Sequence, residues 1–372
     1  MKKKVLFCAT VDYHIKAFHL PYLKWFQEQG WEVHVAASGN LELPYVDVKY
    51  DIGIARSPFK KQNITAIKKL KDTIKLNNYQ IIHCHTPMGG LVTRLAAKKA
   101  REYGTKVIYT AHGFHFYKNA PLINWMLFYP IEKWLSRYTD CLITINTEDY
   151  NAANSLGFKM KTVKHVNGVG VDSERFRPHC TEEIEKIRMK NKYSNNQFLM
   201  IYAAELNKNK NQEFLIRSIS KLKNTIPNVR LLLVGKGLLS DYYKDISKSE
   251  GLEEYIDFLD YREDLHELYP MCDVAVSSSL REGLPVNIIE AMSCGLPIVA
   301  SKNRGHNELV EHNKNGFLFN LNTPDEFYKF ISTLYEEKNK REVVKFESLE
   351  RSQLFSLNRV MSQMISIYNS YL

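Results

Sequence analysis

The chain has 372 residues, of which 44% are hydrophobic and 25% are charged. This length accommodates two domains that each bury a core, and this composition excludes a disordered or fibrous protein. The longest apolar stretch without a charge, residues 119–131, contains two prolines and is too short to span a bilayer. Six cysteines lie scattered without a CxxC pair, so we expect reduced thiols in a cytosolic protein and no disulfide framework.

The positive charge is concentrated in the first half of the chain. Residues 1–180 contain 26 Lys and Arg against 14 Asp and Glu, whereas residues 181–372 contain 25 against 27. A basic half predicts contact with an anionic surface, which phospholipid, a lipid pyrophosphate or nucleic acid can supply. The sequence contains no RNA-binding aromatic motif and no helix-turn-helix pattern, so we expect no nucleic-acid partner.

Strands and helices are expected to alternate along the first half. Apolar runs predict strands over 5–10, 31–37, 81–85, 107–111, 141–146 and 162–166, and amphipathic spacing predicts helices over 18–28, 64–76, 90–103 and 125–138. Strands separated by helices imply a parallel, doubly wound sheet.

The second half repeats this pattern. We expect strands over 198–203, 230–234, 256–259, 274–277 and 297–300, and helices over 213–224, 239–249 and 286–293. A last helix, 357–372, has no strand after it. The prediction is an α/β protein with two Rossmann-like, doubly wound domains, 1–180 and 181–356, whose boundary falls in the charged stretch 178–194, followed by the terminal helix 357–372.

The stretch 277–301 combines several features of a phosphate site. It starts at the carboxyl end of a predicted parallel strand, where open α/β sheets bind ligands. Gly283 permits a tight turn, Pro285 suits the start of a helix, and a helix N-terminus favours an anion. Glu282 and Glu290 flank this start, and each carboxylate can accept hydrogen bonds from vicinal hydroxyls. The simpler alternative is one Glu that favours the helix dipole and one surface Glu.

Two loops offer weaker signals. Lys208 and Lys210 follow the strand 198–203, and an ammonium near the crevice can neutralise a diphosphate, although such a lysine is usually solvated surface. The sequence VGKG at 234–237 resembles a phosphate loop only weakly, and a simple turn between strand and helix explains it equally well.

Histidines gather at two predicted strand ends, as HCH at 83–85 and HGFH at 112–115. His83 and His85 lie on one face of a strand because side chains alternate along it. Four histidines could bind zinc, but imidazoles at strand ends more often line a polar cleft, and no DxD sequence is present. We therefore expect no metal site.

Three motifs together resemble a known family. Residues 282–301 fit the pattern E-x7-E followed by A-M-x-x-G-x-P-I-V-A-S. Residues 168–178 begin with GV and then fit G-V-D-x-x-x-F-x-P. Residues 110–113, Thr110-Ala111-His112-Gly113, fit T-x-H-G. The chain resembles the family 4 glycosyltransferases, and most of all those of bacterial exopolysaccharide and capsule loci. The resemblance covers nearly the whole chain. It implies a GT-B fold, in which two Rossmann-like domains face a cleft and the last helix packs back on the first domain.

The resemblance also assigns roles to residues of the second half. It implies that Glu282 contacts the transferred sugar, that Glu290 contacts the nucleotide ribose, and that the backbone of Gly283, Leu284, Pro285 and Val286 reaches the phosphates. Lys210 matches the lysine of the family's G-R-L-x-x-x-K, whereas Glu205 replaces its arginine. Phosphate neutralisation would then depend on Lys210 and the helix start, and Glu205 could orient Lys210 in the donor site.

The resemblance implies a reaction and its other participants. His112 is expected near the reacting sugar, with packing as the alternative role, and His14, His85 and Gly113 are expected on the acceptor side. The expected reaction is transfer from a nucleotide sugar, most simply a UDP-sugar, to a lipid-linked saccharide, with retention and without a metal or other cofactor. A GT-B sugar-nucleotide epimerase is the alternative function.

Membrane contact is expected from the basic half. Helix 64–76 carries lysines beside an apolar stripe, and helix 125–138 adds aromatic residues that could be interfacial anchors. A solvated face and a core helix are the respective alternatives. The expected location is the cytoplasmic face of the plasma membrane, with peripheral association.

Overall fold

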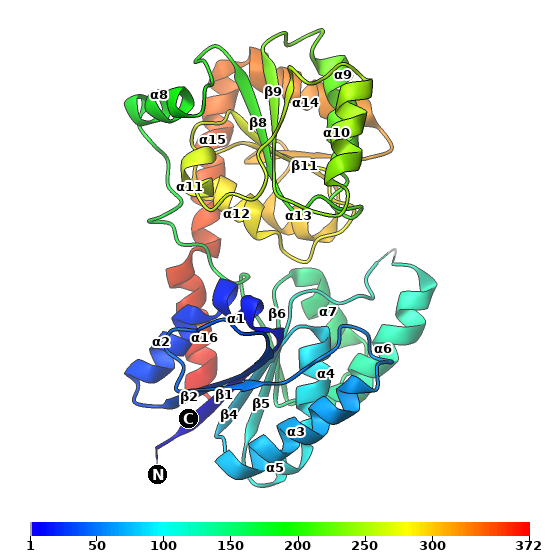
Figure 1. The fold of residues 1–372 in the computed structure, drawn as a ribbon, viewed down its shortest axis with the longest axis vertical. Coiled ribbons are helices and arrows are strands. Elements are labelled where there is room, and N and C mark those ends of the chain that lie inside the picture. Colours follow the sequence, from blue (N-terminus) through cyan, green and yellow to red (C-terminus); the bar gives the residue numbers. More distant parts are fainter. Residues whose placement is uncertain (1, 119) are drawn as a thin grey trace. The chain divides into compact units, whose positions relative to one another are not determined.

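The computed structural model describes residues 2–118 and 120–372. Contacts divide the chain into two compact units (Figure 1). The N-terminal unit contains the described residues up to Val169 together with Val360–Leu372, and the C-terminal unit is Gly170–Arg359. The stretch 178–194, where we expected the boundary, holds a helix of the C-terminal unit. Its Arg188 is buried, and the guanidinium donates to the Met271 carbonyl at 2.8 Å and to Asp273 at 2.9 Å.

The N-terminal unit is built on a seven-stranded parallel sheet of order β3-β2-β1-β4-β5-β6-β7. The central strands are apolar and buried along most of their length, because helices cover both faces and exclude water from them. The strands are β1 Lys4–Val11, β2 Glu32–Ser38, β3 Val48–Asp51, β4 Ile81–His85, β5 Lys106–Ala111, β6 Cys141–Thr144 and β7 Thr162–His165.

The helices of this unit include the end of the chain. They are α1 Asp12–Phe18, α2 Leu20–Glu28, α3 Gln62–Asn77, α4 Pro87–Ala96, α5 Lys98–Glu102, α6 Leu122–Ser136, α7 Thr147–Ser155 and, from Val360 on, α16 Leu357–Asn369. Val360, Met364, Ile367 and Tyr368 of α16 pack in the same core cluster as α2 and β1. The Tyr368 hydroxyl also shares a 2.8 Å hydrogen bond with Nδ1 of the buried His83. The predicted packing of the last helix on the first domain is confirmed.

The C-terminal unit is built on a six-stranded parallel sheet of order β10-β9-β8-β11-β12-β13. Its strands are β8 Phe198–Ala203, β9 Val229–Val234, β10 Ile256–Phe258, β11 Val274–Ser277, β12 Ile298–Ser301 and β13 Gly316–Phe319. Its helices are α8 Thr181–Lys190, α9 Gln212–Leu222, α10 Ser240–Ser249, α11 Leu265–Leu268, α12 Val286–Ser293, α13 Arg304–Leu309, α14 Pro324–Glu336 and α15 Lys338–Ser352, followed by the short 3₁₀ turn η1 Gln353–Phe355.

Both sheets have the doubly wound topology predicted from the sequence. The strand order reverses between β1 and β4 in one unit and between β8 and β11 in the other. Open α/β sheets bind ligands at the carboxyl ends of the strands beside such a reversal. Strands β3 and β13 were not predicted, because β3 is half-exposed and only four residues long and β13 starts at a glycine. The two reversal points are therefore where functional side chains are expected.

Candidate functional site

At the reversal point of the C-terminal unit, the loop after β8 is bonded to the loop after β11. The Ser278 hydroxyl donates to the carbonyls of Lys210 and Asn211 at 3.1 and 2.7 Å, and Asn209 Nδ2 donates to the Arg281 carbonyl at 3.0 Å. The buried Tyr202 hydroxyl lies 2.6 Å from that of Ser279. These bonds fix the position of Lys210 relative to the loop that contains Glu282.

Lys210 and Glu282 form a partly buried ion pair. The ammonium lies 2.6 Å from Glu282 Oε1, and the two side chains are 21% and 11% exposed. In a partly desolvated setting such a pair is stronger than one on an open surface. Glu205 lies in the same loop with an exposed side chain, and its backbone carbonyl accepts from Gln212 Nε2 at 2.9 Å. The carboxylate that orients the lysine is therefore Glu282, not Glu205.

The start of α13 packs closely against the loop that contains Glu282, because residue 305 is a glycine. A Cβ at Gly305 would lie 2.7 Å from Glu282 Cβ and 3.0 Å from its carbonyl carbon. Next to it, Arg304 Nε donates to the Glu282 carbonyl at 3.2 Å. The Asn303 side chain caps α13 and donates to the Ser279 carbonyl at 3.0 Å. The loops after β8, β11 and β12 thus meet around Glu282.

Helix α12 begins at Val286, as predicted, with Pro285 at the N-cap position. The first N–H groups of a helix have no intrahelical acceptor, and together with the helix dipole they favour an anion. Leu284 and Pro285 are buried, and Gly283 and Val286 are half-buried. Asn287 fixes the helix start to the sheet, since its Nδ2 donates to the Ala203 carbonyl at 2.9 Å. The structure thus brings this helix start beside the Lys210–Glu282 pair through β8 and β11.

Glu290 has a different environment from Glu282. It lies on α12 and is half-buried, and no hydrogen-bond donor of the described residues reaches its carboxylate. Burial raises its pKa to about 7, and Arg175 opposes this shift. An unpaired carboxyl with a pKa near neutrality is available for hydroxyl groups of a ligand.

The VGKG sequence has a packing role in this unit. Gly235 has a φ of +145°, and a Cβ there would lie 2.1 Å from the Ala204 carbonyl oxygen. A Cβ at Gly237 would lie 2.1 Å from the carbonyl oxygen of Leu206. The two glycines let this loop approach the backbone of the loop that carries Lys210.

At the reversal point of the N-terminal unit, four histidines meet. His14 lies on α1, His19 lies between α1 and α2, His85 ends β4, and His112 follows β5. One nitrogen of each ring lies within 4.8 Å of the others. Strands β1, β4 and β5 are neighbours in the sheet, so their carboxyl ends bring these residues together. The predicted acceptor-side residues His14, His85 and His112 are thus grouped, whereas His19 was missed because it does not follow a strand.

The other two histidines of the predicted pairs lie outside this cluster. His83 is buried, and its ring nitrogens are bonded to Tyr368 and Thr110, both at 2.8 Å. The His115 ring packs against Phe128, 4.6 Å between centroids. Gly113, between His112 and Phe114, has a φ of +140°, which a side chain rarely tolerates. The HGFH sequence therefore contributes only its first histidine, His112, to the cluster.

In this cluster His19 and His85 are buried, and His14 and His112 are half-buried. Burial lowers the pKa of His14 to about 4 and holds the pKa values of His19, His85 and His112 well below the usual range.

Thr86, next to His85, has a φ of +64° and a ψ of 151°, which is strained for a β-branched residue. Its hydroxyl accepts from Gly89 N and so caps α4. The same hydroxyl lies 2.7 Å from the Thr10 hydroxyl, and this bond holds the end of β4 against β1.

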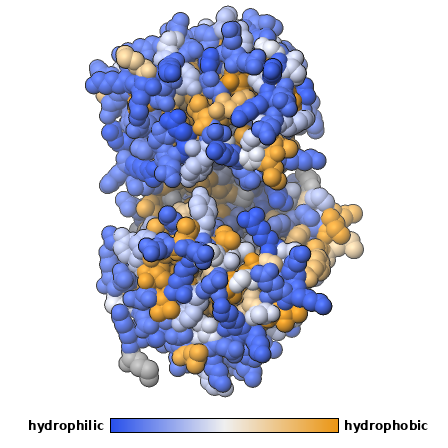
Figure 2. All heavy atoms as spheres, viewed as in Figure 1, coloured by the Kyte–Doolittle hydropathy of each residue, from blue (hydrophilic) through white to orange (hydrophobic). Residues whose placement is uncertain are grey.

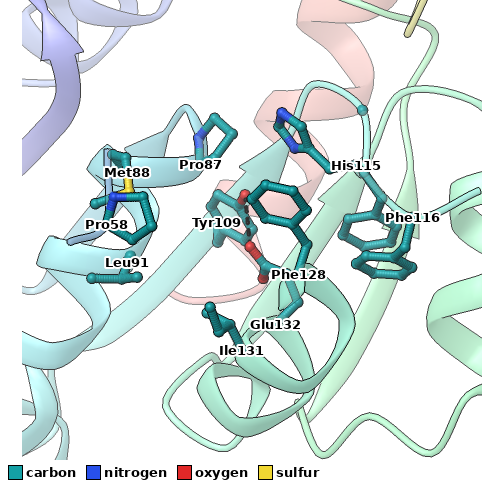
Figure 3. Close-up of a pocket in the computed structure, with 12 residues that line it drawn as sticks. Pro58, Pro87, Met88, Leu91, Tyr109, His115, Phe116, Phe128, Ile131 and Glu132 are labelled. Atoms are coloured by element: carbon teal, nitrogen blue, oxygen red, sulfur yellow. Dashed lines mark hydrogen bonds between the residues drawn. The ribbon is translucent and has the colours of Figure 1, made fainter. Parts of the chain in front are cut away.

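An apolar cavity of about 40 Å³ opens beside Gly113 in this unit (Figure 3). Arg94 and Glu132 form a bidentate ion pair at its side, with distances of 2.9 and 3.1 Å, and the Tyr109 hydroxyl donates to Glu132 at 3.4 Å. The remaining walls are mostly apolar and come from Pro58, Pro87, Met88, Leu91, Phe114, His115, Phe116, Phe128 and Ile131.

Helix α6 presents apolar side chains to solvent. Leu122, Ile123 and Met126 are 80%, 64% and 73% exposed, and Figure 2 shows apolar surface on the part of the unit where α6 lies. Trp125, Phe128 and Tyr129 pack against the core, and Trp134 is 42% exposed. Lys68, Lys69, Lys71 and Lys75 of α3 are exposed. In the described part of the chain, every helix is too short or too polar to cross a bilayer.

Comparison with known proteins gives matches for both units. Residues 4–146 match the family described as glycosyl transferase 4-like, and residues 183–348 match that described as glycosyl transferases group 1. EpsD of Bacillus subtilis (strain 168), which is named as a glycosyltransferase, is 47% identical over 372 residues, covering 100% of this chain and 98% of EpsD.

A second relative and one solved structure are more distant. An Escherichia coli UDP-Gal:alpha-D-GlcNAc-diphosphoundecaprenol alpha-1,3-galactosyltransferase is 29% identical over 290 residues, which cover 74% of this chain and 73% of the relative. The crystal structure of HepE from Anabaena in complex with UDP has a TM-score of 0.81 over 100% of both chains, at 23% identity. HepE has also been solved with UDP-glucose. This likeness agrees with the two parallel-sheet units described above.

Proposed function

The chain belongs to the group 1, family 4-like glycosyltransferases of GT-B fold, and on this premise we propose that it transfers a sugar from a UDP-sugar to a lipid-linked saccharide in exopolysaccharide synthesis. The name of EpsD supports glycosyl transfer, and the name of the E. coli galactosyltransferase, which gives a diphosphoundecaprenol-linked sugar, supports a lipid-linked acceptor. The HepE complexes with UDP and UDP-glucose support a uridine nucleotide as donor.

The observation that carries the proposal is the Lys210–Glu282 ion pair beside the start of α12. In the proposed donor complex the diphosphate lies at this helix start, where Lys210 and the N–H groups neutralise it. Glu282 accepts hydrogen bonds from the sugar hydroxyls, and Glu290 accepts them from the ribose. Glu205, with its exposed side chain, contributes to the donor site through the backbone of its loop.

The proposed chemistry needs no carboxylate nucleophile. The acceptor oxygen bonds to the anomeric carbon while the bond from that carbon to the diphosphate oxygen breaks, and the electron pair remains on the phosphate. The proton of the acceptor hydroxyl passes to the departing phosphate oxygen on the same face, so the configuration is retained. Lys210 and the α12 start stabilise the charge that develops on the diphosphate, which is the main source of catalysis in such a site. We propose that this transfer is independent of a metal.

On the acceptor side, we propose that His112 lies near the reacting sugar and that His14, His85 and Gly113 line the path of the acceptor. The carboxyl ends of β1, β4 and β5 support this, because three of these residues gather there. Exposed apolar side chains on α6 and exposed lysines on α3 support peripheral contact with an anionic cytoplasmic membrane surface, where a lipid-linked acceptor resides.

A thermal-shift panel of UDP, GDP and their sugars, with Glu290→Ala as the matched variant, tests the donor assignment. We expect stabilisation by UDP or one UDP-sugar that the variant loses. A flat response to every nucleotide would contradict it. Turnover of a UDP-sugar without acceptor, giving an epimerised nucleotide sugar, would favour the sugar-nucleotide epimerase instead.

A further inference from the structure

The four-histidine cluster of His14, His19, His85 and His112 contains more nitrogen atoms than the protein satisfies. In the described part of the chain, both ring nitrogens of His19 and of His85 are buried without a hydrogen-bond partner, as are Nε2 of His14 and Nε2 of His112. His19 and His85 are 2% and 1% exposed. Buried polar atoms are almost always paired, and one nitrogen of each of the four rings lies within 4.8 Å of the others, so the cluster indicates a site for a ligand.

The four rings lie in mutual contact. His19 stacks on His85 with centroids 3.7 Å apart, and His14 meets His112 edge to face at 4.8 Å. The cross distances between these pairs are 5.1 to 6.0 Å. With one nitrogen of each ring inside a 4.8 Å limit, a shift of about 1 Å brings four nitrogens to the spacing of a tetrahedral site with metal–nitrogen bonds of about 2.0–2.1 Å.

The four imidazole nitrogens favour one class of metal ion. Neutral imidazole suits zinc and neighbouring transition metals, whereas magnesium and calcium require oxygen ligands. The group of four contains no carboxylate or thiol. A ring nitrogen that carries no proton presents a lone pair, which a cation can use.

We propose that His14, His19, His85 and His112 form a binding site for a transition-metal cation of the zinc class. The site is distinct from the donor site of the C-terminal unit and takes no part in activating the nucleotide sugar.

A bound ion has a consequence for transfer that rests on the proposed function. It would hold the lone pair of His112 and occupy the space that an acceptor hydroxyl needs, so zinc would act as a reversible inhibitor. Binding itself does not depend on that function, because it requires only the four imidazoles.

Direct titration of the untagged full chain with zinc chloride tests the site, with a chromophoric chelator as competitor. A Cys180→Ser background removes the one exposed thiol of the described cysteines. We expect one ion per chain, and cobalt(II) in its place should give the visible absorption of a tetrahedral complex. Magnesium chloride should give no binding.

His19→Gln is the test variant, because it removes two unpaired nitrogens and breaks no hydrogen bond that the structure contains. We expect it to weaken zinc binding by more than about 100-fold, since loss of an outer partner alone costs about 10–100-fold. His266→Gln, a half-buried histidine of the C-terminal unit, is the matched control and should bind zinc like the parent. His19→Leu repeats the test if the glutamine variant is poorly folded.

The outcomes separate the two proposals. Absence of stoichiometric zinc binding, or equal binding by parent and both His19 variants, would overturn the metal site. Zinc should abolish transfer by the parent, a chelator should restore it, and His19→Gln should stay active in zinc. Binding without inhibition would overturn the inhibitory consequence. Stabilisation by UDP, measured without zinc, reports on the donor site alone.

Discussion

Lys210 Nζ lies 2.6 Å from Glu282 Oε1, although the two residues are 72 positions apart in the sequence. The contact arises because β8 and β11 are neighbouring parallel strands, so the loops after them meet at the same edge of the sheet. It connects the residue proposed to neutralise the diphosphate with the residue proposed to hold the sugar. Variants of these two side chains should therefore behave as a unit.

Lys210→Ala should lower kcat/KM for sugar transfer by about 100- to 1000-fold, the usual effect of removing a group that stabilises developing charge. The double variant with Glu282→Gln should lose little more, because each side chain acts through the other. Steady-state kinetics measure both. Lys208→Ala, an exposed lysine two residues earlier in the same loop, is the control and should resemble the parent. Equal losses in the two lysine variants would contradict a specific role for Lys210.

UDP affinity should rise with pH through the ionisation of Glu290. Burial raises the pKa of this carboxyl to about 7, and ribose hydroxyls donate to the ionised form. Between pH 6 and 8 the ionised fraction rises by about tenfold, and affinity should follow it. Calorimetric titration measures the effect. Glu290→Gln is the control, because its UDP affinity should depend on pH only through the ionisation of UDP itself. If UDP affinity changed with pH in the same way in the parent and the variant, the Glu290 carboxyl would be excluded as the cause of the pH dependence.

The same carboxyl should cost stability in the free protein. A raised folded-state pKa means that the unfolded chain ionises first, so this contribution is absent below pH 4.5 and grows as the pH rises to about 7. We expect Glu290→Gln to be more stable than the parent at pH 8 and equal to it at pH 4.5. Urea unfolding without nucleotide measures the difference, and a stability gain at pH 4.5 of the same size would point to packing instead.

Tyr368→Phe should destabilise the N-terminal unit by about 1–3 kcal/mol, because it leaves a buried nitrogen of His83 without its partner. UDP stabilisation should persist, since the donor site belongs to the other unit. Tyr371→Phe is the matched control on the same terminal segment. Its hydroxyl bonds to Thr162 at 2.8 Å in an exposed position, where the loss should stay below about 1 kcal/mol. Urea unfolding of the two variants compares them directly.

Leu122→Ser with Met126→Ser should weaken binding to vesicles with anionic lipids by about tenfold or more, because each exposed side chain can bury apolar area in the interface. Folding stability should hardly change. Vesicle co-sedimentation at low and high salt measures the loss, and the parent should also bind less at high salt because the α3 lysines act through charge. Leu238→Ser, 97% exposed in the C-terminal unit, is the control. Unaltered vesicle binding in the double variant would contradict the role of α6.

The sequence by itself determined the regular parts of this protein. Runs such as Phe198–Ala203 are apolar throughout, which only a strand covered on both faces tolerates, so the parallel sheets followed from the pattern. The start of α12 followed from local chemistry, since Gly283, Pro285 and the apolar spacing after them favour a turn and a helix. Strands β3 and β13 were not predicted, because short or half-exposed segments show little periodicity in hydrophobicity.

Tertiary structure alone decided which side chains meet. Sequence proximity suggested Glu205 as the partner of Lys210, whereas the pairing of β8 with β11 brings in Glu282. Likewise, the HCH and HGFH pairs suggested that His83 and His115 act with His85 and His112, but the order β1-β4-β5 brings together His85, His112 and the predicted His14 with His19, which was not predicted. Alternation along a strand and spacing along a helix are local and can be read from a sequence. The order of strands in a sheet is a long-range choice made by packing.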